Sequence, residues 1–219
     1  MTELLTHRGR PVPYITPWTR EKVTQPNPVA TRHGIAFPGP TSGGRDVDGD
    51  VLWQCWGHNH GAGEPLWSEI HGPRQRHAMH RRLCQVCGGP ADRDKRGWLW
   101  LLEDERDSGP TWPDGEMTTH PPVCRPCLPV AARLCPHLRR RGAVAVRVAE
   151  VIVDAVYGHR YHHGPFGLYA GKADVYLTTS WSAKWVIGNQ LVASLSQCTV
   201  LAPTEVGIET PASRAQIRR

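Results

Sequence analysis

The sequence predicts an α+β protein whose middle third is organised by cysteines. Glycine and proline are frequent, with 22 and 20 occurrences in 219 residues, so turns are many and regular elements are short. The apolar run at 98–102 indicates a strand, whereas apolar residues at three- and four-residue steps over 181–198 indicate a helix. Two Cys-x-x-Cys pairs frame the strand. One compact domain or two small ones fit a chain of this length.

Composition changes along the chain divide it into four segments. Residues 1–50, rich in proline and glycine, form an irregular N-terminal segment with short strands at 12–15 and 34–37. Residues 51–142 form the cysteine-based module. Residues 143–202 are expected to form a small antiparallel sheet packed on one helix, and 203–219 a flexible tail.

Within the module, a strand at 51–56 is followed by a short basic helix at 74–83, which leads into the first cysteine pair. The strand at 98–102 belongs to a β-hairpin between the two pairs. A helix at 128–141 follows the second pair, and Gly142 is well placed to end it.

The segment after the module is expected to contain three strands, at 143–148, 152–161 and 174–178. Ser180 is a good N-cap for the helix that follows. The expected buried stripe of this helix consists of Trp181, Trp185, Gly188, Val192 and Leu195.

The four cysteines of the two pairs, Cys84, Cys87, Cys124 and Cys127, predict one structural zinc ion. A two-residue gap lets one tight turn supply two thiolates, and zinc takes four ligands in a tetrahedron. The two glycines after Cys87 free the backbone to curl around the metal. A redox pair or plain buried thiols are the alternative, but a redox Cys-x-x-Cys follows a strand in a βαβ unit, which this sequence lacks.

The order of pair, hairpin, pair and helix over about 83–141 resembles a treble clef zinc finger. That resemblance implies a fold but not one function, because treble clefs bind nucleic acid, bind proteins or cleave nucleic acid. The strings at 83–92, 119–127 and 135–138 are also similar to a family of proteins common in high-GC actinomycetes, for which no activity is established.

Enzyme activity is not the leading expectation. The treble-clef nucleases of the HNH class carry a histidine base between the pairs and a further polar residue on the helix, but here His120 and His137 alone stand at such places. Histidine clusters occur at 58–60, 77–80 and 159–163, without a carboxylate at a recognised spacing. A degenerate nuclease or another zinc hydrolase stays as an alternative. Whether Cys135, His137 or these clusters hold a second metal is left open.

Basic residues suggest nucleic acid as the first partner to test. The net charge is +6, with 22 Arg and 4 Lys. Two helices side by side would make one phosphate-binding face. Its candidate residues are Arg74, Arg76, Arg81, Arg82, Arg125, Arg133, Arg139, Arg140 and Arg141. A protein–protein adaptor and two merely solvated helix faces are the alternatives.

No secretory signal or membrane-length apolar run is visible, so a cytoplasmic protein that does not contact a membrane is expected. No phosphate-cradling glycine loop or dinucleotide fingerprint is present, so no organic cofactor is expected. The sequence therefore predicts a zinc-stabilised, non-catalytic binding protein.

Overall fold

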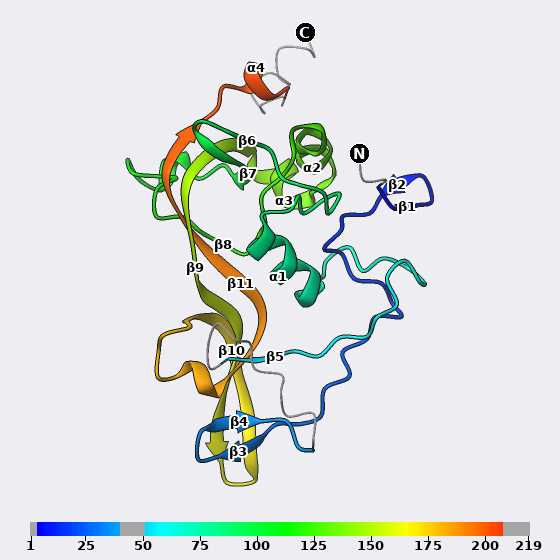
Figure 1. The fold of residues 1–219 in the computed structure, drawn as a ribbon, viewed down its shortest axis with the longest axis vertical. Helices are drawn as coiled ribbons and strands as arrows, with labels where there is room; N and C mark the ends of the chain where they lie inside the picture. Colours follow the sequence, from blue (N-terminus) through cyan, green and yellow to red (C-terminus); the bar gives the residue numbers. More distant parts are fainter. Residues whose placement is uncertain (1–3, 40–50, 208–219) are drawn as a thin grey trace.

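The computed structural model describes residues 4–39 and 51–207, and this part of the chain is mostly β (Figure 1). One mixed sheet of seven strands dominates it. In this sheet β5, β11, β9, β7 and β6 pair in that order, while β10 pairs with β9 and β8 with β11. Its strands are β5 (Leu52–Trp53), β6 (Arg93–Asp94), β7 (Gly97–Glu103), β8 (Met117–Thr118), β9 (Ala143–Gly164), β10 (Gly167–Leu177) and β11 (Val186–Val200).

The predicted fold class is therefore wrong. The expectation was an α+β protein with a central treble-clef-like module and a separate small C-terminal sheet with one helix. Instead, β7, expected to belong to the module's own hairpin, pairs with β9 from Trp98 opposite Val148 to Glu103 opposite Ala143. The hairpin expected of the module is thus part of the one large sheet.

Strand β9 is the axis of this sheet. Its valine-rich first half alternates between the two faces, and β-branched residues suit such a pleated, half-buried position. β9 pairs with β11 from Val146 opposite Val200 to Arg160 opposite Val186. The strands expected at 143–148 and 152–161 are consequently one continuous strand.

The helix expected at 181–198 is also wrong, because this segment forms β11. The pairing with β9 is irregular between Gly188 and Gln190 and again between Val192 and Ala193. At the first irregularity the extra residue is Asn189 of β11, and at the second it is Asp154 of β9. The extra residue at Asn189 shifts the two-residue alternation of β11, so its apolar residues no longer show a simple strand period. Ser180 does accept a turn bond from the Ala183 amide at 2.9 Å, ahead of the short 3-10 helix η3 (Ala183–Trp185).

Helix α1 (Gly72–Arg81) confirms the basic helix expected at 74–83 and packs on β11. Its Gln75 amide donates to the Leu191 carbonyl and accepts from the Leu191 amide, both at 2.9 Å. These bonds satisfy the backbone of β11 beside its bulges, where the ladder is interrupted.

The helix expected at 128–141 is divided in two, α2 (Leu128–Leu134) and α3 (Pro136–Arg141). Pro136 has no amide hydrogen to continue α2, and Cys135 before it is extended. Gly142 ends α3 with a positive φ of 98°, as expected.

The sheet has a hydrophobic core on each face. Alternate residues of β7 divide between the cores, since Trp100 lies in the core with α1 and Leu99 in the core with the cysteines. Buried Arg147 of β9 reaches the edge of the second core and pairs with Asp92 and Asp94. The metal-binding cysteines are therefore built into one face of the sheet.

The N-terminal segment forms two small hairpins, β1 (Thr6–His7) with β2 (Arg10–Pro11), and β3 (Val29–Thr31) with β4 (Gly34–Ala36). The stretch 12–15 belongs to no strand. It is a strap bonded to the rest of the molecule, with the Tyr14 amide donating to Val86 and the Ile15 carbonyl accepting from His71.

The beginning of the expected tail is ordered by packing. α4 (Pro203–Val206) follows β11, and Leu201 and Val206 are buried in the core that holds the cysteines. The remainder of that expectation, 208–219, lies outside the described residues, and the four-segment division stays a prediction. Over 4–39 and 51–207, no helix has the length and apolar character needed to cross a membrane.

Candidate metal centre

The first cysteine pair sits on a tight turn after α1. Arg82 closes the helix in the left-handed conformation, with φ 53°. Cys84 donates through its amide to Gly89 at 2.7 Å and accepts the Gly88 amide at 2.8 Å. Gly88 has φ +71°, and a Cβ there would meet the Tyr14 ring at 2.8 Å. Only glycine fits this turn, because the strap lies directly against it.

The second pair sits where a helix begins. Cys124 accepts amides from Cys127 and Leu128, both at 3.1 Å, through the short 3-10 helix η2 (Arg125–Cys127). The backbone just before it is held on both sides, because the Val123 amide donates to Leu99 and the Val123 carbonyl accepts from Asp92. The large sheet therefore positions both pairs.

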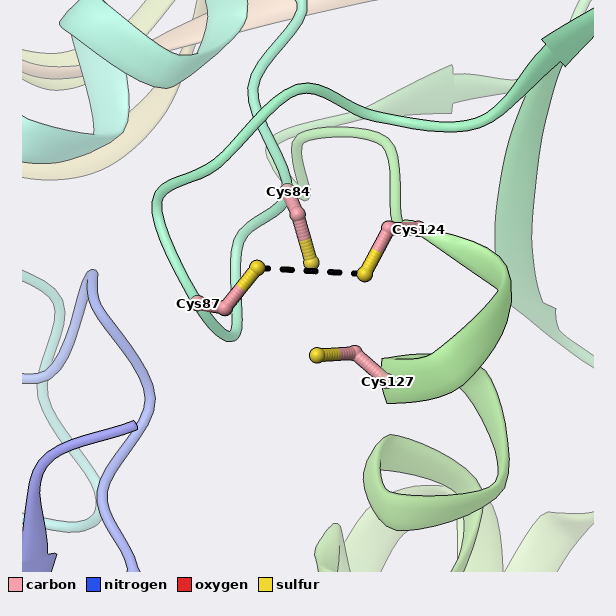
Figure 2. A group of neighbouring side chains, drawn as sticks. All are labelled: Cys84, Cys87, Cys124 and Cys127. Atoms are coloured by element: carbon pink, nitrogen blue, oxygen red, sulfur yellow. Dashed lines mark hydrogen bonds between the residues drawn. The ribbon is translucent and has the colours of Figure 1, made fainter. Parts of the chain in front are cut away.

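The four sulfurs converge, as Figure 2 shows. The ligand atoms of Cys84, Cys87, Cys124 and Cys127 all lie within 4.8 Å of one another. The sulfurs of Cys87 and Cys124 are 3.8 Å apart, and Zn–S bonds of about 2.3 Å in a tetrahedron place sulfurs about 3.8 Å apart. All four are free thiols and not disulfides. The cluster is thus consistent with a zinc site.

Electrostatics within the cluster also suit a cation. The hydrogen bond from Cys127 lowers the pKa of Cys84 to about 5, although burial opposes this change. The same bond raises the pKa of Cys127, and burial above all raises the pKa of Cys124 to about 12. A negative charge on one sulfur thus disfavours deprotonation of its neighbours, because thiolates so close together repel one another. A divalent cation among them would neutralise this repulsion.

The cluster is partly shielded from water. Cys84 and Cys127 are buried among Leu99, Leu128 and their neighbours, while Cys87 and Cys124 are only partly covered. Four protein ligands leave no position for water or substrate, which is the arrangement of structural and not of catalytic zinc.

The other candidate ligands lie outside this cluster. Within the described residues, the four cysteines are the one group with metal-binding geometry, so Cys135, His137 and the histidines at 58–60, 77–80 and 159–163 do not join it. Cys55 and Cys198 pack elsewhere in the molecule. His120 contributes its backbone carbonyl to the Trp100 indole at 2.8 Å.

The arginines proposed for nucleic acid fall into two groups. Several already have partners within the protein: Arg74 is buried against Glu21, and Arg82 donates to the carbonyls of Met79 and Val151. Arg76 lies 4.2 Å from the centre of the Trp53 ring. Arg125 donates to the Glu205 carbonyl and Arg141 pairs with Glu103. The exposed remainder consists of Arg81, Arg133, Arg139 and Arg140.

Two of these exposed arginines meet a residue that sequence reasoning missed. Arg133 of α2, Arg139 of α3 and Arg10 of β2 line an open hollow of about 400 Å³ together with Leu134. No pattern near Arg10 indicated this, because more than 100 residues of sequence separate it from α2. Sequence reasoning also missed the buried Glu21 and His71 beside Arg74.

The fold and the site define a mostly-β protein with a four-cysteine metal-binding module in its sheet. Comparison of the chain with protein-family models, with curated proteins and with solved structures gave no match. The similarity to an actinomycete family therefore stays a prediction.

Proposed function

We propose that this chain is a non-catalytic binding protein, stabilised by structural zinc, whose partner is nucleic acid. The proposal of structural zinc rests on the convergence of four sulfurs, with no fifth protein ligand among the described residues. Four-cysteine coordination supplies folding free energy and leaves no open position on the metal for chemistry.

The proposal of a nucleic-acid partner rests on the hollow between β2, α2 and α3. In the described part of the chain, the guanidinium groups of Arg10, Arg133 and Arg139 have neither an ion pair nor a hydrogen-bond acceptor. Guanidinium groups without carboxylate partners that line one hollow suit phosphate oxygens, which they bind in a planar, bidentate manner.

Zinc and this hollow are connected through the chain. α2 begins at Leu128, directly after the ligand Cys127, and its apolar side packs in the same core as the cysteines. Metal binding would therefore fix the position of Arg133, which lies on the same short helix. Loss of zinc is expected to weaken nucleic-acid binding without any change in an arginine.

The test is fluorescence anisotropy with labelled mixed-sequence DNA over a series of salt concentrations. The Arg133→Ala/Arg139→Ala variant should bind at least about tenfold more weakly, and its salt slope should fall by about 1.4 to 1.8, because each lost phosphate contact removes about 0.7 to 0.9.

The matched control is Arg32→Ala/Arg106→Ala, which removes the same charge from exposed sites elsewhere. Equal affinity losses in the two variants would mean that only net charge matters. If the wild-type protein binds no nucleic acid at low salt, the partner proposal is wrong and a protein partner becomes the next candidate.

A further inference from the structure

The far end of the large sheet forms a projecting arm. We define the arm as 155–182, which contains the end of β9, all of β10 and the segment after it. β9 pairs with β10 from Ala155 opposite Leu177 to Gly164 opposite Gly167. Figure 1 shows this hairpin at the opposite end of the molecule from α2 and α3. The arm is thus a surface distinct from the arginine hollow.

Large aromatic side chains are exposed on this arm. Phe166 at the turn is fully exposed, while Trp181 and Tyr169 are 71% and 55% exposed. Exposing such apolar area is unfavourable in water, and groups of such residues mark interaction surfaces.

Two of these aromatic rings contact side chains of β9, one a histidine and the other an arginine. The Tyr169 ring stacks on His162, its directly opposite partner, with ring centres 5.5 Å apart and planes 27° from parallel. The Arg160 guanidinium lies 5.2 Å from the Trp181 ring. Arg160 and His162 are two residues apart on β9, so their side chains share a face.

The charge of the arm favours an anionic partner. Arg160 and Lys172 are its two permanent cations, and Lys172 lies in the β10 bulge opposite Arg160. Asp174 is the sole carboxylate within 155–182, and it lies opposite Gly158, two residues from Arg160 along β9.

Flat aromatic rings interleaved with cations fit unpaired bases and their phosphates. Bases stack on aromatic side chains with little sequence preference, while neighbouring cations follow the backbone. Only single strands offer free base faces, since those of a duplex are stacked on one another.

We propose that the arm binds single-stranded nucleic acid by stacking bases on Phe166, Tyr169 and Trp181, beside Arg160 and Lys172. This inference deepens the proposed function and rests on it, because it names the form of nucleic acid that the protein prefers. The arginine hollow binds phosphates of either form, whereas the arm distinguishes single strands from duplexes.

The experiment compares the full chain with a Phe166→Ala/Tyr169→Ala/Trp181→Ala variant. The probes are a labelled mixed-sequence single-stranded DNA, its duplex, and an abasic strand of the same length. The variant should bind the single strand at least about tenfold more weakly, because one stacked base contributes roughly a 5- to 100-fold effect. Its affinity for the duplex and for the abasic strand should change less than about twofold.

Trp67→Ala is the matched control, because Trp67 is 52% exposed but lies outside the arm. Its affinity for the single strand should equal that of the wild-type protein. Thermal unfolding midpoints identical to wild type would show that the three arm substitutions leave the fold intact, as their exposure predicts.

Several outcomes overturn the inference. Unchanged affinity of the arm variant for the single strand would do so, as would an equal loss on the abasic strand, since stacking needs bases. Binding to phosphatidylglycerol vesicles that disappears in the arm variant, without single-strand binding, would assign the arm to a membrane instead.

The two proposals fail separately. If the Arg133→Ala/Arg139→Ala variant loses affinity for every probe while the arm variant binds like wild type, the hollow stands and the arm inference falls. If only the arm variant loses affinity, the hollow is not the phosphate site and the arm alone binds nucleic acid.

Discussion

Glu21 and Arg74 form a buried, bidentate ion pair that ties the N-terminal segment to helix α1. The two oxygen–nitrogen distances are 2.5 and 2.8 Å, and Glu21 is 1% and Arg74 9% exposed. The same guanidinium also donates to the carbonyl of Tyr14 in the strap and to that of Thr16 directly after it. This pair holds the strap against the turn of the first cysteine pair.

We expect Glu21→Ala to destabilise the protein by about 3–5 kcal/mol, because it leaves the Arg74 charge buried without a counterion. Urea unfolding followed by circular dichroism measures this change. The double variant Glu21→Leu/Arg74→Met should recover much of the loss, since an apolar pair of similar volume removes the uncompensated charge.

The exposed pair between Arg106 and Asp104 provides the comparison. Arg106→Ala should change the free energy of unfolding by less than about 1 kcal/mol, because water already screens this pair. A Glu21→Ala effect as small as this one would mean that the buried pair does not anchor the strap.

His71, which lies beside the Glu21–Arg74 ion pair, makes the stability of the protein sensitive to acid. Burial and the Arg74 guanidinium lower the pKa of His71 to about 4 from 6.5, although Glu21 acts to raise it. The unfolded chain therefore binds a proton at higher pH than the folded protein does. The stability from neutral His71 is fully present above pH 6.5 and is lost as pH falls towards 4, by on the order of 3 kcal/mol.

His71→Asn tests this pH dependence, because asparagine keeps an N-cap acceptor for the Arg74 amide and does not titrate. The difference in unfolding free energy between wild type and variant should shrink from pH 7 to pH 4. Subtraction removes the acid sensitivity that both proteins share, that of the cysteine thiolates included. A difference that is constant with pH would contradict the assignment.

Two glycines face each other where β9 enters the arm beside the start of β11. Gly158 is directly opposite Gly188, and a Cβ on Gly158 would lie 2.2 Å from the Ile187 carbonyl oxygen. A Cβ on Gly188 would meet the Trp53 ring at 2.8 Å. The missing side chain of Gly158 therefore lets β9 approach β11 closely, and that of Gly188 leaves room for the Trp53 ring.

Gly158→Ala should consequently cost at least about 2 kcal/mol, since the clash is with backbone and cannot be relieved by a rotamer change. Differential scanning calorimetry would record the lower unfolding midpoint. Gly115→Ala is the comparison for a glycine with open space around it, where the cost comes from its φ of +85° alone. A milder effect at Gly158 than at Gly115 would contradict this account.

What the sequence predicted correctly is local. Two cysteines two residues apart and glycine after the pair specify a turn by themselves, so the four-sulfur cluster followed from spacing. β7 and α1 were also predicted, because their own patterns are strong and short-range.

What the sequence did not predict depends on pairing between distant segments. β11 is a strand because β9 lies beside it, and the bulge at Asn189 interrupts the alternation that would have revealed it. Arg74 was expected on an exposed, phosphate-binding face, but Glu21, 53 residues away, pairs with it inside the protein. Neither partner is visible in a local window of sequence.

The metal centre gives the sharpest prediction. Cys84→Ser and Cys127→Ser should each lose bound zinc, because a serine hydroxyl stays protonated and cannot replace a buried thiolate. Structural zinc contributes on the order of 10–16 kcal/mol in small finger peptides, as much as a whole domain's stability of about 5–15 kcal/mol. The core that contains these two cysteines also holds Leu99 of β7 and Leu128 of α2, so metal loss should release α2 from the sheet. Zinc content by atomic emission and amide hydrogen exchange across 128–141 would measure both effects.

Cys55→Ser and Cys198→Ser should keep one zinc per chain, since both lie outside the cluster. A Cys84→Ser protein that retains its zinc and its protected α2 would show that the four sulfurs do not share one ion.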